Sequence, residues 1–231
     1  MSSGGYVTNF DTPWPEVPAL LWPALEQTLE MVVFTSLIVG IFGLLLGVLL
    51  HNTSSHVAAV FPRKSAYGVA NGLVNVGRSM PFLILMAFLI PFTRLLVGTS
   101  VGIAAAVVPM SIAGIPWFAR IVENALRNLP EDLVAASLAA GASPRQAILS
   151  AQISEGLPAL IGAMTITVIG IVDFSALAGA IGAGGLGFLA LDYGYNRFDS
   201  HVMLATVVTI VVLVQLIQFV GNRLARATAK P

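Results

Sequence analysis

Long stretches without a single charged side chain are the feature that most constrains how this chain folds. No Asp, Glu, Lys or Arg occurs in residues 31–62, 95–119 or 200–222, and shorter uncharged stretches cover residues 79–93 and 156–172. The hydrocarbon core of a bilayer offers no water to pair with backbone amides, so a spanning segment must satisfy its own hydrogen bonds as a helix. The pattern therefore predicts a bundle of membrane-spanning helices.

The composition excludes the main classes of water-soluble protein. Hydrophobic residues make up 57% of the 231 residues and charged residues only 10%, against about 25% charged residues in an ordinary soluble domain. Lys and Arg total 11, as do Asp and Glu, so no excess positive charge is available to neutralise nucleic-acid phosphates. The absence of cysteine excludes disulfides and thiolate metal sites. We expect an all-α protein of the lipid bilayer, with no nucleic-acid partner, no metal and no cofactor.

The lengths of the uncharged stretches predict the number of crossings. Each crossing of the hydrocarbon core needs about 20 apolar residues, which leaves room for five or six. We place five membrane-spanning helices near residues 31–51, 73–92, 100–118, 157–176 and 201–221. The chain is then divided into an external N-terminal segment (1–28), a transmembrane domain (29–225) that contains a long inner loop (119–156), and a cytoplasmic tail (226–231).

Residues 176–191 are also uncharged, but their glycines argue against a sixth span. Each glycine lowers the stability of a helix by about 1 kcal/mol relative to alanine. Five of them are crowded together: Gly179, Gly182, Gly184, Gly185 and Gly187. We expect a re-entrant or outer-surface connection that is buried against protein, in which the last four glycines let the backbone pack closely.

The distribution of Lys and Arg predicts the orientation, because these residues favour the cytoplasmic side of a membrane. If the N-terminus lies outside, the outer segments hold only Arg94 and Arg197. The inner segments then hold Arg63, Lys64, Arg120, Arg127, Arg145, Arg223, Arg226 and Lys230. We therefore expect an outside N-terminus and a cytoplasmic C-terminus. The first 30 residues lack the basic n-region of a signal peptide, so we expect the first span to be retained.

The long inner loop is too polar to cross the membrane and too long for a simple turn. Glu131 and Asp132 complement the positive end of a helix dipole, and Gly141 suits the left-handed position after a helix. Ser143 suits the N-cap of a second short helix that ends at Ile153. The pattern predicts two short helices joined by a glycine bend. From periodicity alone, a connector that lies on the membrane surface is an equal alternative.

The loop resembles a known motif. The run Gly-Ala-Ser-Pro-Arg-Gln at 141–146, followed by Glu-Gly-Leu-Pro at 155–158, resembles the cytoplasmic EAA loop of ABC importer permeases. Residues 135–137, Ala-Ala-Ser, occupy the positions of the Glu-Ala-Ala triplet in that loop. The acidic residue of the triplet is absent, and an acidic pair lies about one helical turn earlier. Ser154 stands where the family often has proline.

Five further segments resemble one branch of this family, the methionine-importer permeases. These segments are residues 76–85, 89–95, 97–100, 116–123 and 179–187. The resemblance implies a type I ABC importer permease fold with five spans in the bacterial inner membrane. It also implies a homodimer that works with two ATPase subunits and an external methionine-binding protein to import methionine, in its L or D form. An importer of another small amino acid and an ion-driven carrier are the alternatives.

The resemblance makes the inner loop a docking element for a separate ATPase. A P-loop needs Gly-Lys-Ser/Thr, and neither Lys64 nor Lys230 follows a glycine, so we expect no ATPase activity in this chain. Gly141 is expected to be the bend through which motion is transmitted, and an ordinary helix cap is the alternative. The candidate ATPase-coupling residues are Arg127, Glu131, Asp132, Leu133, Ala135, Ala136, Ser137, Leu138, Gly141, Ala142, Ser143 and Arg145.

The transport pathway is expected between two copies of the chain, along the spans that flank the inner loop. Candidate pathway or gate residues are Met164, Thr165, Thr167, Asp173 and Ser175. A flexible thioether suits a gate, but core packing is the alternative for the methionine. An ionisable residue in a span is a functional candidate by default, but the aspartate could also be solvated at the outer end of its span. The residues with an expected structural role are Arg78, Pro81, Pro158, Gly182, Gly184, Gly185 and Gly187.

Two short motifs are typical of enzymes but lack the surroundings that those enzymes need. Residues 182–187 match G-x-G-x-x-G, yet no strand precedes them and no acidic residue follows at the required distance. Residues 98–102 match G-x-S-x-G without a strand-turn-helix context. A serine nucleophile also needs a base such as histidine, and His51, His56 and His201 lie at no suitable depth. We therefore expect no enzyme.

Overall fold

The computed structural model describes residues 11–229, and all regular structure in this range is helical. Four helical runs are long and apolar enough to cross a membrane, namely α1 (Val17–Thr53), α5 (Ile103–Arg127), the 40-residue run Pro144–Ala183 and α10 (Ser200–Thr228). α2 (Lys64–Ser79) and α3 (Phe82–Phe88) are bent by 100° and make a fifth crossing if they are taken as one broken span. The predicted all-α membrane fold is confirmed.

The remaining elements are short or lie within the 40-residue run. They are α4 (Ile90–Val97), α6 (Asp132–Ala139), α7 (Pro144–Gln146), α8 (Ser154–Ala178), α9 (Gly185–Leu189) and the π-helical segments η1 (Ala147–Ile153), η2 (Gly179–Ala183) and η3 (Ala190–Asn196). α7, η1 and α8 follow one another without an intervening loop, and the backbone leaves helical geometry at Ile181 and Gly182 within η2. π-Helical turns occur mostly inside longer helices and often at functional sites.

The second predicted span, 73–92, is corrected in its extent and shape. The helix begins at Lys64 and ends at Ser79. Pro81 lacks a backbone N–H and disfavours helical backbone at the residue before it, and Met80 is extended with φ −92° and ψ 130°. The break expected at Pro81 is present, and it turns the chain by 100°.

The helices extend into the segments predicted as the inner loop and as the external N-terminal segment. α5 extends to Arg127, so the first part of the predicted loop belongs to a spanning helix. The second short helix does not end at Ile153, because helical backbone continues through Ser154 into α8. The excursion between spanning helices is therefore residues 128–143. At the other end of the chain, α1 begins at Val17, inside the segment predicted to be external.

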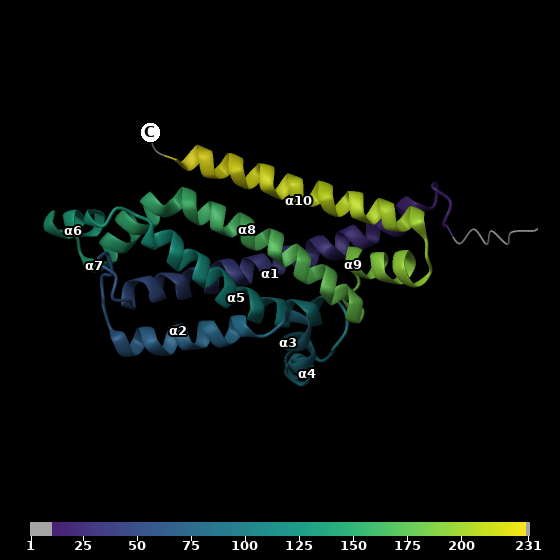
Figure 1. Ribbon diagram of the computed structural model, residues 1–231, viewed down its shortest axis with the longest axis horizontal. Coiled ribbons are helices and arrows are strands. Elements are labelled where there is room, and N and C mark those ends of the chain that lie inside the picture. The colour runs from purple at the N-terminus through teal and green to yellow at the C-terminus, as the bar shows by residue number, and fades with distance from the viewer. Residues whose placement is uncertain (1–10, 230–231) are drawn as a thin grey trace, which may run out of the picture.

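The bundle is held together where α1 and α5 lie side by side at close range (Figure 1). A Cβ added at Gly47 of α1 would lie 2.7 Å from the Ala119 carbonyl oxygen and 2.6 Å from the Val122 side chain. Gly114 of α5 is covered by Val39 of α1 in the same way, at 2.6 Å. Small residues let helices approach closely in a membrane, where packing drives their association. The buried core around this contact includes Met31, Val39, Met110, Phe118, Val122 and Leu126.

The elements divide between two ends of an elongated bundle (Figure 1). α6 and α7 lie at one end, together with the C-terminal end of α10. α9 and the start of α10 lie at the opposite end, near the first described residues of the chain. The two ends of the described chain are thus on opposite sides of the bundle, as an odd number of crossings requires.

The glycine-rich segment packs against α1 through direct hydrogen bonds. The N–H of Gly185 donates to Gln27 Oε1 at 2.7 Å, and the N–H of Leu186 donates to Thr28 Oγ1 at 2.8 Å. Gly187 lies so close to α8 that an added Cβ would be 2.2 Å from a carbonyl oxygen of that helix. The close backbone packing expected of these glycines is present at Gly187, whereas Gly182, Gly184 and Gly185 lie nearest to side chains.

The residues before α1 close onto the start of α10. Thr12 donates to Asp199 Oδ2 from its backbone N–H at 2.9 Å and from its hydroxyl at 2.5 Å. Asp199 also caps α10 by accepting from the Val202 N–H at 3.0 Å, and Trp14 stacks on His201 with ring centroids 4.4 Å apart. Burial opposes ionisation of Asp199, but the hydrogen bonds from Thr12 and Val202 outweigh it and lower the pKa of this carboxyl below its ordinary value.

We predict that Gly187→Ala lowers the free energy of unfolding by about 1–3 kcal/mol, because the new methyl group overlaps a backbone carbonyl. Gly72→Ala is the matched control. A Cβ at Gly72 meets no atom within 4 Å, and replacing an interior helical glycine by alanine stabilises a helix by up to about 1 kcal/mol. Thermal unfolding in detergent distinguishes the two variants, and equal unfolding temperatures would contradict the packing.

We predict that Asp199→Ala destabilises the protein by about 1–2 kcal/mol, because it removes a helix cap and the acceptor for Thr12. Since the pKa of Asp199 is lower in the folded chain, its contribution is complete above the ordinary pKa of about 4 and is lost as the pH falls through the folded-state pKa. Thermal unfolding in detergent should therefore show a difference between variant and wild type that narrows below about pH 4. A difference that stays constant down to about pH 3 would count against this assignment.

Candidate functional site

We call residues 128–146 the coupling segment, and its turn is defined by backbone hydrogen bonds. Gly141 has a φ of 88°. Its N–H donates to the Leu138 carbonyl at 3.0 Å, and the Ala142 N–H donates to the Ser137 carbonyl at 3.1 Å. These bonds form a Schellman motif, which places a left-handed residue directly after a helix. The helix end predicted at Gly141 is confirmed.

The chain re-enters a helix through a capping box. The Gln146 N–H donates to Ser143 Oγ at 3.4 Å, and the Ser143 N–H donates to Gln146 Oε1 at 2.8 Å. Pro144 occupies the first turn, where a missing N–H costs no hydrogen bond. The predicted N-cap at Ser143 is confirmed. Local sequence therefore specifies both sides of the turn.

α6 is attached to the rest of the chain by one buried side chain. Val134 is 5% exposed and packs against Ala58 and Ala147. The candidate coupling residues are half-buried (Arg127, Leu133, Ser137, Ala142) or exposed (Glu131, Asp132, Ala135, Ala136, Leu138, Gly141, Ser143, Arg145). α6 is thus a short helix with one apolar anchor and an uncovered outer surface.

A pair of buried amide side chains fixes η1 to the end of α1. Asn52 Nδ2 donates to Gln152 Oε1 at 2.9 Å, and Gln152 Nε2 donates to Asn52 Oδ1 at 3.0 Å. Gln152 also donates to the Ala58 carbonyl at 2.9 Å, and Asn52 accepts from the Val60 N–H at 3.2 Å. Leaving a buried amide unpaired costs about 1–3 kcal/mol. The amide pair therefore sets the position of the helix that follows the coupling segment.

A fully buried carboxylate joins α5 to α2 at the same end of the bundle. Glu123 accepts from Arg120 at 2.5 Å and from Arg127 at 2.6 Å, and the Tyr67 hydroxyl of α2 donates to it at 3.3 Å. Arg120 also donates to the side-chain oxygens of two asparagines of α2, at 2.5 and 2.9 Å. Removing one partner of a buried ion pair costs about 3–5 kcal/mol. The network therefore fixes the point at which the chain leaves α5 for the coupling segment.

The hydroxyl groups predicted to line the pathway are engaged within α8. Thr165, Thr167 and Ser175 each donate to a carbonyl oxygen three or four residues earlier in the helix, at 2.7–2.8 Å. All three side chains are buried. Thr165 lies directly against Gly221 of α10, where an added Cβ would be 2.1 Å from its hydroxyl oxygen. Thr165 therefore holds α8 and α10 close together.

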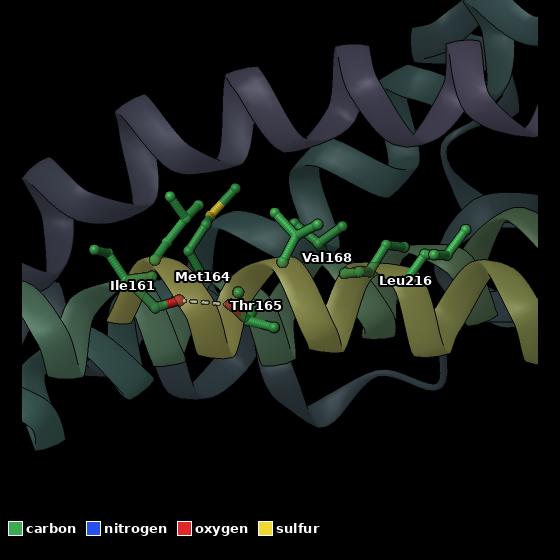
Figure 2. A pocket seen from close by; sticks show the side chains of 9 residues that line it. Ile161, Met164, Thr165, Val168 and Leu216 are labelled. Atoms are coloured by element: carbon green, nitrogen blue, oxygen red, sulfur yellow. Dashed lines mark hydrogen bonds between the residues drawn. The ribbon is translucent and has the colours of Figure 1, made fainter. Parts of the chain in front are cut away.

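Met164 and Thr165 line an open apolar groove between α8 and α10, with a volume of about 480 Å³. Figure 2 shows Val168 and Leu216 along the same groove. Thr165 is the one polar side chain among the described residues that line it, and its hydroxyl is bonded to the Ile161 carbonyl (Figure 2). The groove therefore presents no free polar group to a charged ligand.

A different face of α8 is uncovered and carries a charge. Its members recur every three or four residues and so share one side of the helix. This open face of α8 consists of Ala159, Gly162, Ile166, Gly170, Asp173 and Leu177. A Cβ added at Gly162 or Gly170 would meet no atom within 4 Å. Within residues 11–229, Asp173 makes no ion pair or hydrogen bond.

The predicted structural residues lie where the chain breaks or changes direction. Arg78 is in the last turn of α2, and its guanidinium carbon is 5.8 Å from the centre of the Trp117 ring. Pro158 lies inside α8, shortly after the π-helical segment η1. Gly182 and Gly184 have positive φ values of 98° and 83°, which glycine adopts without strain.

Sequence reasoning missed both polar clusters behind the coupling segment. The spacing of Arg120, Glu123 and Arg127 places an acid between two bases on one helix face, and this signal could have predicted the buried network. Asn52 and Gln152 are 100 residues apart. No local pattern connects them, so only the fold reveals the amide pair.

Comparison with known proteins gives consistent matches. Residues 43–230 match the family described as binding-protein-dependent transport system inner membrane component. The chain is 44% identical over 208 residues to the probable D-methionine transport system permease protein MetI of Vibrio cholerae, covering 90% of this chain and 91% of that protein. It is 42% identical over 160 residues to the D-methionine transport system permease protein MetI of Escherichia coli K12, covering 69% and 73%.

Solved structures show the same arrangement of helices. A chain of the MetNI methionine ABC transporter in an inward-facing conformation matches with a TM-score of 0.91 and 41% identity, covering 95% of this chain and 100% of that one. A chain of an amino acid ABC transporter matches with a TM-score of 0.74 and 18% identity, covering 92% and 96%. The second likeness is one of fold alone.

We predict that Gln152→Leu lowers the free energy of unfolding by about 1–3 kcal/mol, because it leaves the Asn52 amide buried without its partner. Asn52→Leu should cost a similar amount. The double variant should cost less than the sum of the two single variants, because neither amide is then left unpaired. Thermal unfolding of the wild type, the two single variants and the double variant in detergent provides the double-mutant cycle. Additive costs would show that the two amides do not act as a pair.

Proposed function

Because the chain belongs to the family of binding-protein-dependent transport system inner membrane components, we propose that it is the permease subunit of an ATP-driven importer that moves methionine into the cell. The chain is a multi-pass inner-membrane protein. Relatives that match most of its length are named as D-methionine permeases, and its helices superpose on those of a methionine ABC transporter. Within the chain, the exposed coupling segment is the observation that carries the proposal.

The proposed importer contains two copies of this chain, two copies of a cytoplasmic ATPase and an external methionine-binding protein. The chain contains no Gly-Lys-Ser/Thr sequence, so we assign ATP hydrolysis to the partner subunit. The excess of Lys and Arg in the segments at the α6 end supports a cytoplasmic position for that end. The start of α10 and the N-terminus are then outside.

α6 is proposed as the helix that the ATPase holds. Glu131 and Asp132 are exposed at its start and offer carboxylates for polar contacts. Ala136 and Leu138 are exposed as well and offer a small apolar surface. Because Val134 anchors only one side of the helix, the opposite side is available to a partner without any rearrangement of the bundle.

Motion of α6 would reach the spanning helices through rigid connections. Beyond the turn at Gly141, helical structure runs from Pro144 to Ala180, before the kink at Ile181 and Gly182. The Asn52–Gln152 pair ties the start of this run to α1. Glu123 ties α5 to α2 just before the coupling segment. A displacement of α6 is therefore passed to the spanning helices and is not absorbed by a flexible loop.

We propose that the pathway runs along the open face of α8, between two copies of the chain. A charged side chain is costly against lipid and normally faces protein or water. Because Asp173 lies on this face, we infer that the face borders a water-filled pathway and not lipid. A gate role for Met164 stays a prediction, and Thr165, Thr167 and Ser175 are proposed to hold the helices that form the pathway wall.

Copurification and transport test this function together. An affinity-tagged copy of the chain, expressed in its native host, should bring down an ATPase. Proteoliposomes that contain the purified complex, with the binding protein added, should accumulate labelled methionine with ATP and not with ADP. Uptake driven by an ion gradient without ATP would identify a secondary carrier instead. ATP-dependent uptake of another amino acid, but not of methionine, would overturn the assigned substrate.

We predict that Gly141→Leu reduces methionine uptake at least about tenfold, which corresponds to about 1.4 kcal/mol, while the complex stays assembled. A side chain at a left-handed position costs about 1–2 kcal/mol, so the bend that positions α6 is disfavoured. Uptake per copurified ATPase in proteoliposomes measures the effect.

Gly98→Leu is the matched control for this prediction. Gly98 ends α4 with a φ of 81°, and an added Cβ there also meets no atom within 4 Å. Its conformational cost should equal that at Gly141, but it lies outside the coupling segment. Uptake that falls equally in both variants would assign Gly141 an ordinary structural role.

A further inference from the structure

Asp173 carries a carboxylate that no other described residue pairs with. Within residues 11–229 this side chain forms no hydrogen bond or ion pair, and it is exposed on the open face of a spanning helix. Ionisable groups inside a membrane face a protein interior or water, and they mark substrate or ion paths. Asp173 therefore faces water or a group that this single chain does not supply.

Asp173 lies at the edge of a small cavity between α5 and α8, with a volume of about 140 Å³. Gly114 and Trp117 line it from α5, and Gly170 and Phe174 line it from α8. Drug-sized ligands occupy about 300–1,000 Å³, so this cavity suits a single small side chain. Since a Cβ at Gly170 meets no atom within 4 Å, the missing side chain leaves space that nothing else fills.

A cation also lies close to the Trp117 ring. The guanidinium carbon of Arg78 is 5.8 Å from the centre of that ring, within the range of a cation–π interaction. Arg78 forms no ion pair in the described chain. Trp117 is therefore flanked by an acid and a base that are not paired with each other. Opposite charges beside an aromatic surface match a ligand that carries both charges and an apolar group.

We propose that Asp173, Trp117 and Arg78 form a binding site for a zwitterionic α-amino acid within the pathway. This site rests on the proposed function and names how the substrate is held during passage. Asp173 accepts hydrogen bonds from the ammonium group, and Arg78 donates to the carboxylate. The apolar side chain enters the cavity beside Gly170 and Trp117, where a thioether gains favourable contact with the ring.

Labelling with photo-methionine, which carries a diazirine in its side chain, tests the site directly. The complete complex in detergent is irradiated with this probe, and the labelled peptides are mapped by mass spectrometry. We expect labels within residues 114–117 and 170–174, and competition by unlabelled methionine. The hydroxy-acid analogue of methionine, which lacks the ammonium group, should compete at least about tenfold less well.

Two variants and one control refine the test. Asp173→Asn removes the charge, and Gly170→Leu fills the cavity. Each should reduce labelling at least about tenfold. Gly170→Leu should not lower the unfolding temperature, because it replaces a helical glycine at an open position. Asp192→Asn makes the same chemical change in η3, where the acid is paired with Arg197, and should label and transport as wild type does.

The outcomes separate this site from the proposed function. Labels in this chain that fall only outside residues 114–117 and 170–174, or labelling of these residues that is equal in Asp173→Asn and Asp192→Asn, would overturn the site. If wild-type complexes transport methionine with ATP and both site variants do so equally well, the site fails and the function stands. If labelling follows the proposal but no ATP-dependent uptake occurs, the function fails and the site stands.

Discussion

The absence of water in the bilayer core is the constraint on which the rest of this structure depends. Polar groups there must find partners in the protein, because an unsatisfied group costs several kcal/mol. Burial inside the protein makes the same demand. Glu123 meets it with two arginines and a tyrosine hydroxyl, and Asn52 and Gln152 meet it with each other. Both clusters lie at the end that carries α6. Asp173 has no such partner in the described chain. Its carboxylate is stable in a spanning helix only if water or another molecule forms hydrogen bonds with it.

Interruptions of the helices are placed where protein surrounds them or where the chain has left the bundle. The glycine segment that follows α8 is enclosed by α1, which supplies hydrogen-bond acceptors from Gln27 and Thr28. The turn at Gly141 satisfies its own carbonyls through a Schellman motif. Non-helical backbone is tolerated in membrane proteins on these terms alone. Hydrogen bonds therefore fix the backbone at these breaks as they do within the helices. The breaks can then hold the flanking helices at a defined angle.

Much of this architecture could be predicted from local sequence, and the rest depends on contacts between distant residues. Gaps between charges revealed the spans, and Gly141 and Ser143 marked the ends of short helices, because backbone geometry there follows from one residue type. The start of α2 at Lys64 was missed, since Lys64, Gly68 and Asn71 lower the hydropathy of its first half. Val134 was missed as the anchor of α6 because its neighbour Ala58 comes from a different loop. The hydroxyls of α8 were predicted to line the pathway, but they donate to carbonyl oxygens of their own helix. The sequence does not show which acceptor a hydroxyl group will use.

The continuity of α7, η1 and α8 connects the coupling segment to the open face of α8. α8 alone has 25 residues and rises roughly 38 Å at 1.5 Å per residue, which exceeds the thickness of a bilayer core. One end of this helical run follows the coupling segment directly, and the other is fixed against α1 through the glycine segment. Asp173 lies between them on the same run. Packed helices shift as rigid units between discrete arrangements because tightly packed interfaces do not deform continuously. A partner that moves α6 would therefore act on the open face of α8 through the hydrogen-bonded turn at Gly141 and the helical run that begins at Pro144.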